Sequence, residues 1–151
     1  MVKSIPEGYT SVTPYLTFRD AKTAIAFYER ALGAKELVRM PMPDGRIGHA
    51  ELQIGNARIM LADESPMMGN KSPHSIGGTP ISLCLYTENV DAVAARFVEA
   101  GGKMKRELTN QFYGDRSGQF EDPEGYSWTL AQHVEDVSPE EMKRRMDKMG
   151  Q

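Results

Sequence analysis

The chain has 151 residues and a net charge of -3, with 40% hydrophobic and 26% charged residues. This composition is typical of a globular domain and excludes a disordered chain. Because 21 acidic residues outnumber 18 basic ones, we expect no nucleic-acid partner, and without a stretch of ~20 apolar residues we expect no membrane partner.

The only cysteine, Cys84, excludes an intramolecular disulfide framework and any metal site that needs several cysteines. A free thiol is typical of a reducing compartment. Residues 1–8 lack the apolar segment of a secretory signal. We therefore expect a cytoplasmic protein.

The first half of the chain predicts one strand, one helix and three further strands. Residues 11–18 are rich in β-branched and aromatic side chains, and Pro14 indicates a strand start or a sheet edge. Asp20 is a suitable cap for a helix that ends at Gly33. Hairpin-type turns then separate strands expected at 35–42, 46–54 and 57–62.

Residues 63–79 are rich in Gly, Pro and Ser and predict a long loop, which is either functional or a linker. The second half then repeats the order of the first. We expect a strand at 80–87, a helix at 89–100 and strands at 103–108, 112–121 and 126–132. Residues 138–148 begin with a capping box and predict a C-terminal surface helix.

The two halves therefore form an internal βαβββ repeat, with module 1 at about 10–62 and module 2 at about 80–133. The expected fold is α+β, with two tandem βαβββ modules forming a curled mixed sheet around an open cavity and helices on the outer face. The alternative is an α+β sandwich without a cavity.

Strand alternation separates a core face from an open face. The apolar core positions are Leu16, Phe18, Ile59, Leu61, Leu83, Leu85, Trp128 and Leu130. The open face is mixed and suits a small, partly apolar molecule. The expected ligand-binding residues there and at the cavity mouth are Tyr15, His49, Glu51, Met60, Cys84, Tyr86, Tyr113 and Arg116.

Several of these residues also have a simpler structural interpretation. Glu51 is a partner for Arg46 or Arg58, and Arg116 for Asp115 or Glu121. Cys84 lacks a cationic neighbour in sequence and is expected to be inert. The methionines of the second strand and the long loop line either a pocket or a dimer interface; they are Met40, Met42, Met67 and Met68.

Residues 14–34 and 120–126 resemble the opening and closing segments of the vicinal oxygen chelate superfamily, which includes glyoxalases, bleomycin-resistance proteins and extradiol dioxygenases. Residues 111–118 and 133–141 resemble its PhnB-like branch. The resemblance covers about 10–142 and implies a single domain of this type over 1–151. It also implies a homodimer, in which two subunits share a cavity.

Enzymes of this superfamily bind a divalent metal through His and Glu on four strands. The resemblance places those ligand positions at Thr13, Met60, Ser82 (or Cys84 in a shifted register) and Thr129. Hard divalent ions need carboxylate or imidazole ligands, so we expect neither the usual metal nor another cofactor. The sequence leaves one alternative, which is a metal site at His49 and Glu51 with Cys84 or His133 as a further ligand.

Three functions follow from this sequence. The first is a glyoxalase/bleomycin-resistance-like protein that binds a small molecule without the usual metal. The second is a lyase, isomerase or dioxygenase that uses a relocated metal at His49 and Glu51, or these two catalytic candidates as an acid–base pair. The third is a structural or regulatory dimer without a ligand.

Overall fold

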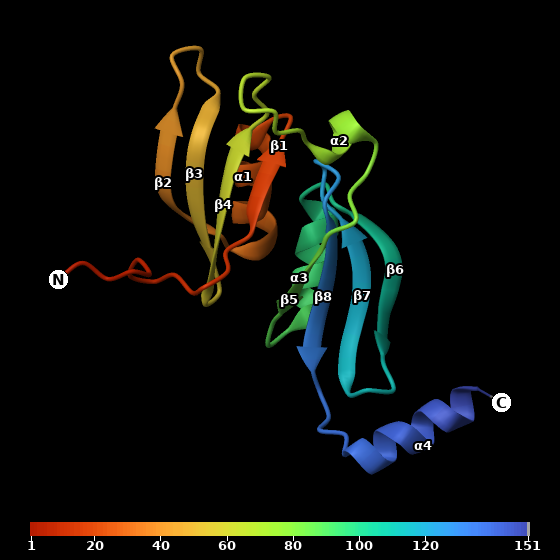
Figure 1. Ribbon diagram of the computed structural model, residues 1–151. Coiled ribbons are helices and arrows are strands. Elements are labelled where there is room, and N and C mark those ends of the chain that lie inside the picture. Colours follow the sequence, from red (N-terminus) through yellow and green to blue (C-terminus); the bar gives the residue numbers. More distant parts are fainter. Residues whose placement is uncertain (151) are drawn as a thin grey trace.

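The sequence repeat folds into two four-stranded sheets, each with one long helix against it (Figure 1). The computed structural model describes residues 1–150. The first sheet has the order β1-β4-β3-β2 and the second has the order β5-β8-β7-β6. Their bounds are β1 Tyr15–Phe18, β2 Lys35–Pro41, β3 Ile47–Ile54, β4 Ala57–Asp63, β5 Ser82–Tyr86, β6 Lys103–Asn110, β7 Asp115–Glu121 and β8 Ser127–His133.

Strand pairing is the same in both sheets. The first strand of each module runs parallel to its last strand, as in the pairs Tyr15 with Met60 and Ser82 with Ser127. The remaining neighbours are antiparallel. The expected α+β fold of two βαβββ modules is confirmed, and the curled sheet consists of two separate halves.

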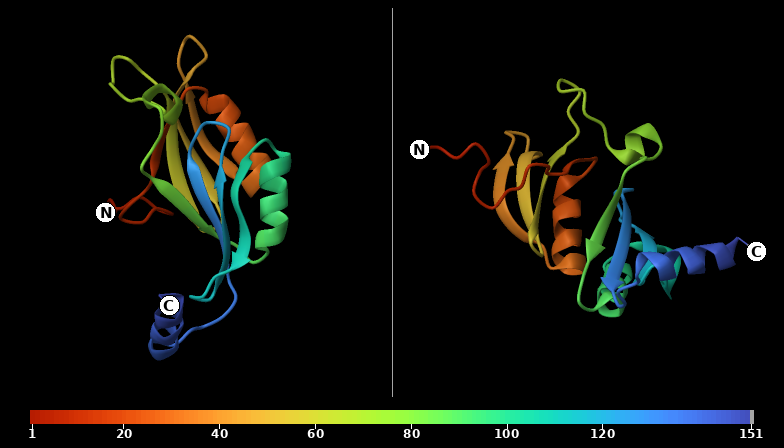
Figure 2. Two further views of the ribbon diagram at one scale, coloured as in Figure 1. Left: turned by 90° about the vertical axis from the view of Figure 1, so that its right-hand side faces the viewer. Right: turned by 60° about the horizontal axis from the view of Figure 1, so that its bottom comes forward.

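The long helices α1 (Ala21–Leu32) and α3 (Val90–Glu99) are capped as the sequence predicts. The Asp20 side chain accepts a hydrogen bond from the Thr23 amide, and the Asn89 side chain accepts one from Ala92. Gly33 ends α1 with φ 66°, a conformation that glycine adopts at little cost. Figures 1 and 2 show both helices on the same side of the two sheets, so neither long helix covers the opposite sheet faces.

The core lies between these helices and the two sheets. Phe27 of α1 packs edge to face on Phe97 of α3, with ring centroids 5.0 Å apart. The apolar sheet positions predicted from alternation face this core: Leu16, Phe18, Ile59, Leu61, Trp128 and Leu130 are buried, and Leu83 and Leu85 pack partly buried against them. One core therefore joins the modules.

Three predicted elements differ in their details. The first strand begins at Tyr15 instead of residue 11. Pro14 has no N–H to donate to β4, and it takes part only through its carbonyl, which accepts a hydrogen bond from the Met60 amide. Strand β7 begins at Asp115, after a turn in which Gly114 has φ 103°. The loop 63–79 contains one helical turn, α2 (Pro73–Ile76), which Ser72 caps.

The C-terminal helix α4 (Pro139–Met149) extends away from both sheets (Figure 1). It has no buried residue. Arg145 ties it to the body by donating to the Phe112 carbonyl at 2.8 Å and to the Glu135 carboxylate at 2.9 Å. Among residues 1–150, none of the helices has the length and apolarity needed to cross a membrane.

Candidate functional site

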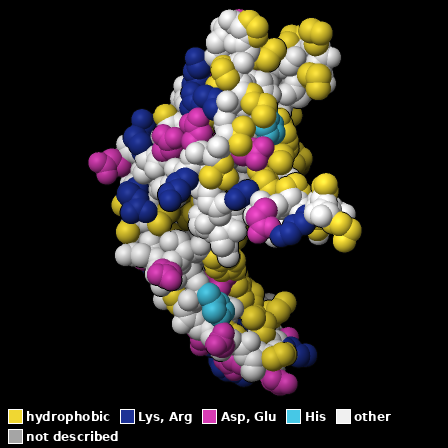
Figure 3. All heavy atoms as spheres, turned by 90° about the vertical axis from the view of Figure 1, so that its left-hand side faces the viewer, with side chains coloured by type: hydrophobic (Ala, Val, Ile, Leu, Met, Phe, Trp, Pro, Cys, Tyr) yellow, Lys and Arg dark blue, Asp and Glu magenta, His cyan; other side chains and the backbone are white. Residues whose placement is uncertain are grey.

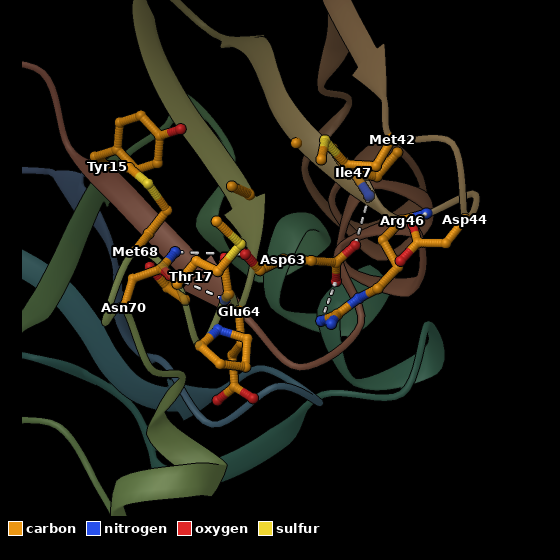
Figure 4. Close-up of a pocket in the computed structure, with 15 residues that line it drawn as sticks. Tyr15, Thr17, Met42, Asp44, Arg46, Ile47, Asp63, Glu64, Met68 and Asn70 are labelled. Atoms are coloured by element: carbon orange, nitrogen blue, oxygen red, sulfur yellow. Dashed lines mark hydrogen bonds and ion pairs between the residues drawn. The ribbon is translucent and has the colours of Figure 1, made fainter.

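A pocket of about 650 Å³ opens beside the first sheet, at the ends of β1 and β4. Its walls come from the β2–β3 hairpin and from the segment 64–70, which follows β4 (Figure 4). The apolar lining includes Met42, Ile47, Ala62, Met67 and Met68, and Tyr15 stands at one end. Figure 3 shows hydrophobic side chains prominent on the two loops at the top of this module.

Two acidic groups of the pocket hold its walls in place. Asp63 accepts hydrogen bonds from the Ala21 amide at 2.8 Å and the Ile47 amide at 2.7 Å, and thereby fixes the start of α1 to the hairpin. Glu64 accepts from the Ser72 amide at 2.6 Å. Hydrogen bonds from Ser72 and Ser75 lower the pKa of Glu64 to about 2, so it is ionised at neutral pH. Both carboxylates therefore already accept hydrogen bonds from backbone amides.

A chain of four side chains runs across the open face of the first sheet next to the pocket. The Tyr15 Oη lies 2.8 Å from Nδ1 of His49, and Nε2 of His49 lies 2.8 Å from Oε2 of Glu51. The Tyr9 hydroxyl donates to the other oxygen of Glu51. Positions 49 and 51 face the same way on β3 because side chains alternate along a strand, so the predicted pair His49 and Glu51 does come together.

Comparison with known proteins agrees with this architecture. Residues 10–130 match the family model Glyoxalase/Bleomycin resistance protein/Dioxygenase superfamily. The chain belongs to this superfamily. Mb0911c, an uncharacterized protein of Mycobacterium bovis, is 41% identical over 143 residues, which are 93% of this chain and 94% of that protein.

Solved structures of other proteins share the fold. TioX from Micromonospora sp. ML1 is 24% identical with a TM-score of 0.67, over 83% of this chain and 99% of TioX. A PhnB protein from Bacillus cereus is 19% identical with a TM-score of 0.64, over 82% of this chain and 99% of that one. At these identities the likeness shows the fold alone, and membership in the PhnB-like branch stays a prediction.

The positions that hold a divalent metal in enzymes of the superfamily do not suit one here. The resemblance assigns these positions to Thr13, Met60, Ser82 and Thr129, whose hydroxyls and thioether are not the carboxylate or imidazole ligands such ions require. Within residues 1–150, no three His, Cys, Asp or Glu side chains gather as a metal-binding group. Both ring nitrogens of His49 already have partners in Tyr15 and Glu51.

The second module carries a different polar cluster on its open face. Tyr86 donates to Asp115 Oδ2 at 2.6 Å, and His133 Nδ1 lies 2.8 Å from Asp115 Oδ1. His133 Nε2 lies 2.7 Å from Asp136. Hydrogen bonds that His133 donates to Asp115 and then to Asp136 raise the pKa of His133. Burial alone would raise the pKa of Asp115, but the hydrogen bonds from Tyr86 and His133 outweigh it and lower that pKa.

The other predicted ligand-binding residues lie apart from the pocket lining. Arg116 forms a bidentate pair with Asp91 on α3, at 2.9 and 3.0 Å, instead of the expected pair with Asp115 or Glu121. Met60 pairs across from Tyr15 and Glu51 in the first sheet.

Burial, followed by the charge of Asp115, raises the pKa of Cys84, so its thiol is poorly activated. Tyr86 and Tyr113 belong to the second module.

Sequence reasoning missed several residues that shape this site. Arg46, Ile47 and Ala62 line the pocket, and Tyr9 completes the chain with Glu51. Tyr9 belongs to an N-terminal segment without regular secondary structure, so no periodicity indicated its contact. A stronger signal was present for Met42, Met67 and Met68, because residues 40–42 and 67–68 are rich in methionine. Met42, Met67 and Met68 line the pocket and Met40 does not, and the alternative of a dimer interface stays a prediction.

Proposed function

We propose that this superfamily member binds a small, partly apolar molecule in the pocket beside β1 and β4, without the usual divalent metal. The observation that supports this proposal is the pocket of about 650 Å³, with its thioether, aliphatic and aromatic lining. This volume lies in the range of about 300–1,000 Å³ that small-molecule sites occupy. Methionine side chains adapt to ligands of irregular shape.

The charged groups of the pocket favour an uncharged ligand. Asp63 and Glu64 are engaged by backbone amides, and Arg46 lies 3.9 Å from Asp63 with the acidic Asp44 on the same wall. A ligand anion would therefore meet nearby carboxylates. Tyr15 and Thr17 line the pocket and carry hydroxyl groups, which suit a ligand with one carbonyl or hydroxyl group.

The binding experiment uses 4-phenylbutan-2-one, a neutral ketone with an aromatic ring, and titration calorimetry. We expect saturable binding that is unchanged by EDTA or by added Mg²⁺, Mn²⁺ or Zn²⁺. Met68→Asp places a charge at the pocket and weakens binding at least tenfold, whereas Met146→Asp on α4 leaves it unchanged. Met68 is 81% exposed and Met146 is 55% exposed, so both variants should fold.

Three results would contradict this proposal. The first is no saturable binding to the wild-type protein, and the second is binding that appears only with a divalent ion. The third, a loss of equal size in Met68→Asp and Met146→Asp, would place the ligand elsewhere or show nonspecific adsorption.

We further propose a homodimer in which a second copy covers part of the open sheet faces. These faces carry exposed apolar side chains, including Tyr86 at 60% and Met40, which pairs across from His49, at 55% exposed. Proteins that stay monomeric rarely leave large apolar patches in water. Light scattering should give twice the chain mass of 16.8 kDa. A dimer that binds neither ketone nor metal would favour the structural or regulatory alternative.

A further inference from the structure

The contacts of His49 define the direction of its hydrogen bonds. The Glu51 carboxylate is an acceptor only, so the His49 nitrogen that faces it, Nε2, carries a proton. A neutral imidazole then has Nδ1 as an acceptor, and the Tyr15 hydroxyl at 2.8 Å is its donor. The chain therefore runs from a phenol through an imidazole to a carboxylate.

The carboxylate at the end of this chain is held ionised. Hydrogen bonds from Tyr9 and then His49 lower the pKa of Glu51. The guanidinium of Arg58 lies 4.8 Å from the centre of the Tyr9 ring and adds a positive charge nearby. The Glu51 side chain is only 18% exposed and that of His49 23%, so water screens their interaction incompletely.

Tyr15 connects this chain to the pocket. It lines the pocket at the end opposite Asp44 and Arg46, with Met68 next to it (Figure 4). Its oxygen uses its proton for His49 and keeps lone pairs for a ligand. Burial and the charge of Glu51 raise the pKa of Tyr15, so the resting phenol is protonated.

We propose that Tyr15, His49 and Glu51 form a proton relay that makes this pocket a metal-independent isomerase site for small enolisable carbonyl compounds. This inference rests on the proposed binding function. Tyr15 is the catalytic residue, because it alone of the three lines the pocket. His49 accepts the proton through Tyr15, and Glu51 is a positioning residue that orients the imidazole and stabilises its charged form.

The reaction is a balanced proton transfer. The C–H bond next to the substrate carbonyl breaks, its proton moves to Tyr15 Oη, and the Tyr15 proton moves to Nδ1 of His49. The electron pair of the C–H bond forms the enolate, and Glu51 lies against the resulting imidazolium. Return of a proton to carbon or to the enolate oxygen gives the starting ketone or its enol and regenerates the relay. No oxidant, reductant or other co-reactant is required.

The test measures exchange of the protons next to the carbonyl of 4-phenylbutan-2-one in D₂O by proton NMR. We expect the wild-type protein to accelerate exchange in a saturable manner that EDTA leaves unchanged. Tyr15→Phe keeps the ring and should keep binding, but it should lower the exchange rate about 100-fold, which is the usual size of one acid–base group. His49→Gln should have a similar effect.

A matched control is His74→Gln, because His74 is an exposed histidine whose Nε2 contacts the Pro123 carbonyl outside the pocket. Its exchange rate should equal that of the wild type. Binding without accelerated exchange, or acceleration that survives in Tyr15→Phe, would overturn the relay and leave the binding proposal intact. Absence of binding by the wild type would overturn both.

A second measurement tests the relay without any ligand. Nitrogen-15 chemical shifts of the His49 ring should show the neutral tautomer with its proton on Nε2. Glu51→Gln should reduce the preference for this tautomer, since a carboxamide oxygen is a weaker acceptor than a carboxylate. A proton on Nδ1 in the wild-type protein would reverse the direction of the Tyr15 hydrogen bond and contradict the proposal.

Discussion

At the scale of residues, the buried carboxylate of Asp122 shows how one side chain organises the turn between β7 and β8. Its Oδ2 accepts from Tyr28 at 2.5 Å and from Trp128 Nε1 at 3.0 Å. Its Oδ1 accepts the amides of Glu124 and Tyr126. Because Tyr28 belongs to α1, this carboxylate fastens the second module to the first.

Removing this carboxylate should destabilise the protein strongly. Asp122→Ala leaves the Tyr28 hydroxyl and the Trp128 N–H buried without a partner, which costs about 1–3 kcal/mol for each group. Tyr28→Phe removes one donor and should cost about 1 kcal/mol. Urea denaturation followed by Trp128 fluorescence gives both values. If Asp122→Ala lowers the free energy of unfolding less than Tyr28→Phe does, the role of Asp122 is contradicted.

The His133 cluster predicts a pH dependence of stability. The pKa of His133 is raised above its ordinary value of 6.5 in the folded protein by hydrogen bonds with Asp115 and Asp136. Its stabilising contribution is therefore complete below the unfolded pKa and is lost as the pH rises through the folded pKa.

Asp136→Asn removes one of the two carboxylates and should lower the pKa of His133 in an NMR titration. It should also lower the urea midpoint more at about pH 5.5 than at about pH 9, because only protonated His133 uses this charge. Asp147→Asn, which removes an exposed partner of Lys143 on α4, is the control and should leave the His133 titration unchanged. An unchanged titration in Asp136→Asn would show that the contact is absent in solution.

At the scale of elements, α1 and α3 meet through Phe27 and Phe97 and join the two modules. Phe97→Ala should lower the free energy of unfolding by about 3–5 kcal/mol, the usual cost of a large cavity. Val98→Ala on the same helix is the control, since Val98 is 45% exposed and should cost well under 1 kcal/mol. Equal costs for the two variants, measured by urea denaturation, would place the helix contact outside the core.

The elements were largely predictable because their signals are local. Asp20 and Gly33 bound α1, and alternation assigned core positions such as Leu61 and Trp128 correctly. The extent of the first strand was wrong because residues 11–14 have the composition of a strand, whereas Pro14, which lacks an N–H, limits the pairing with β4 to Tyr15–Phe18. The single turn α2 was missed because four residues carry no periodicity.

At the scale of the whole molecule, the site depends on contacts between distant segments. The pair His49 and Glu51 followed from strand alternation, whereas Tyr9 reaches Glu51 from 42 residues away and Arg116 reaches Asp91 from 25 residues away. The pocket combines a hairpin, two strand ends and the segment 64–70. The sequence indicated a cavity lined by open-face residues, but only the folded chain shows which of them share one pocket.

The most direct test of the central claim uses methyl NMR of the ten methionines. Titration with 4-phenylbutan-2-one in the presence of EDTA should shift the methyl signals of Met42, Met67 and Met68, which line the pocket. The signals of Met142, Met146 and Met149 on α4 should stay in place. Absence of saturable shifts at the pocket methionines, or shifts that require a divalent ion, would contradict the account.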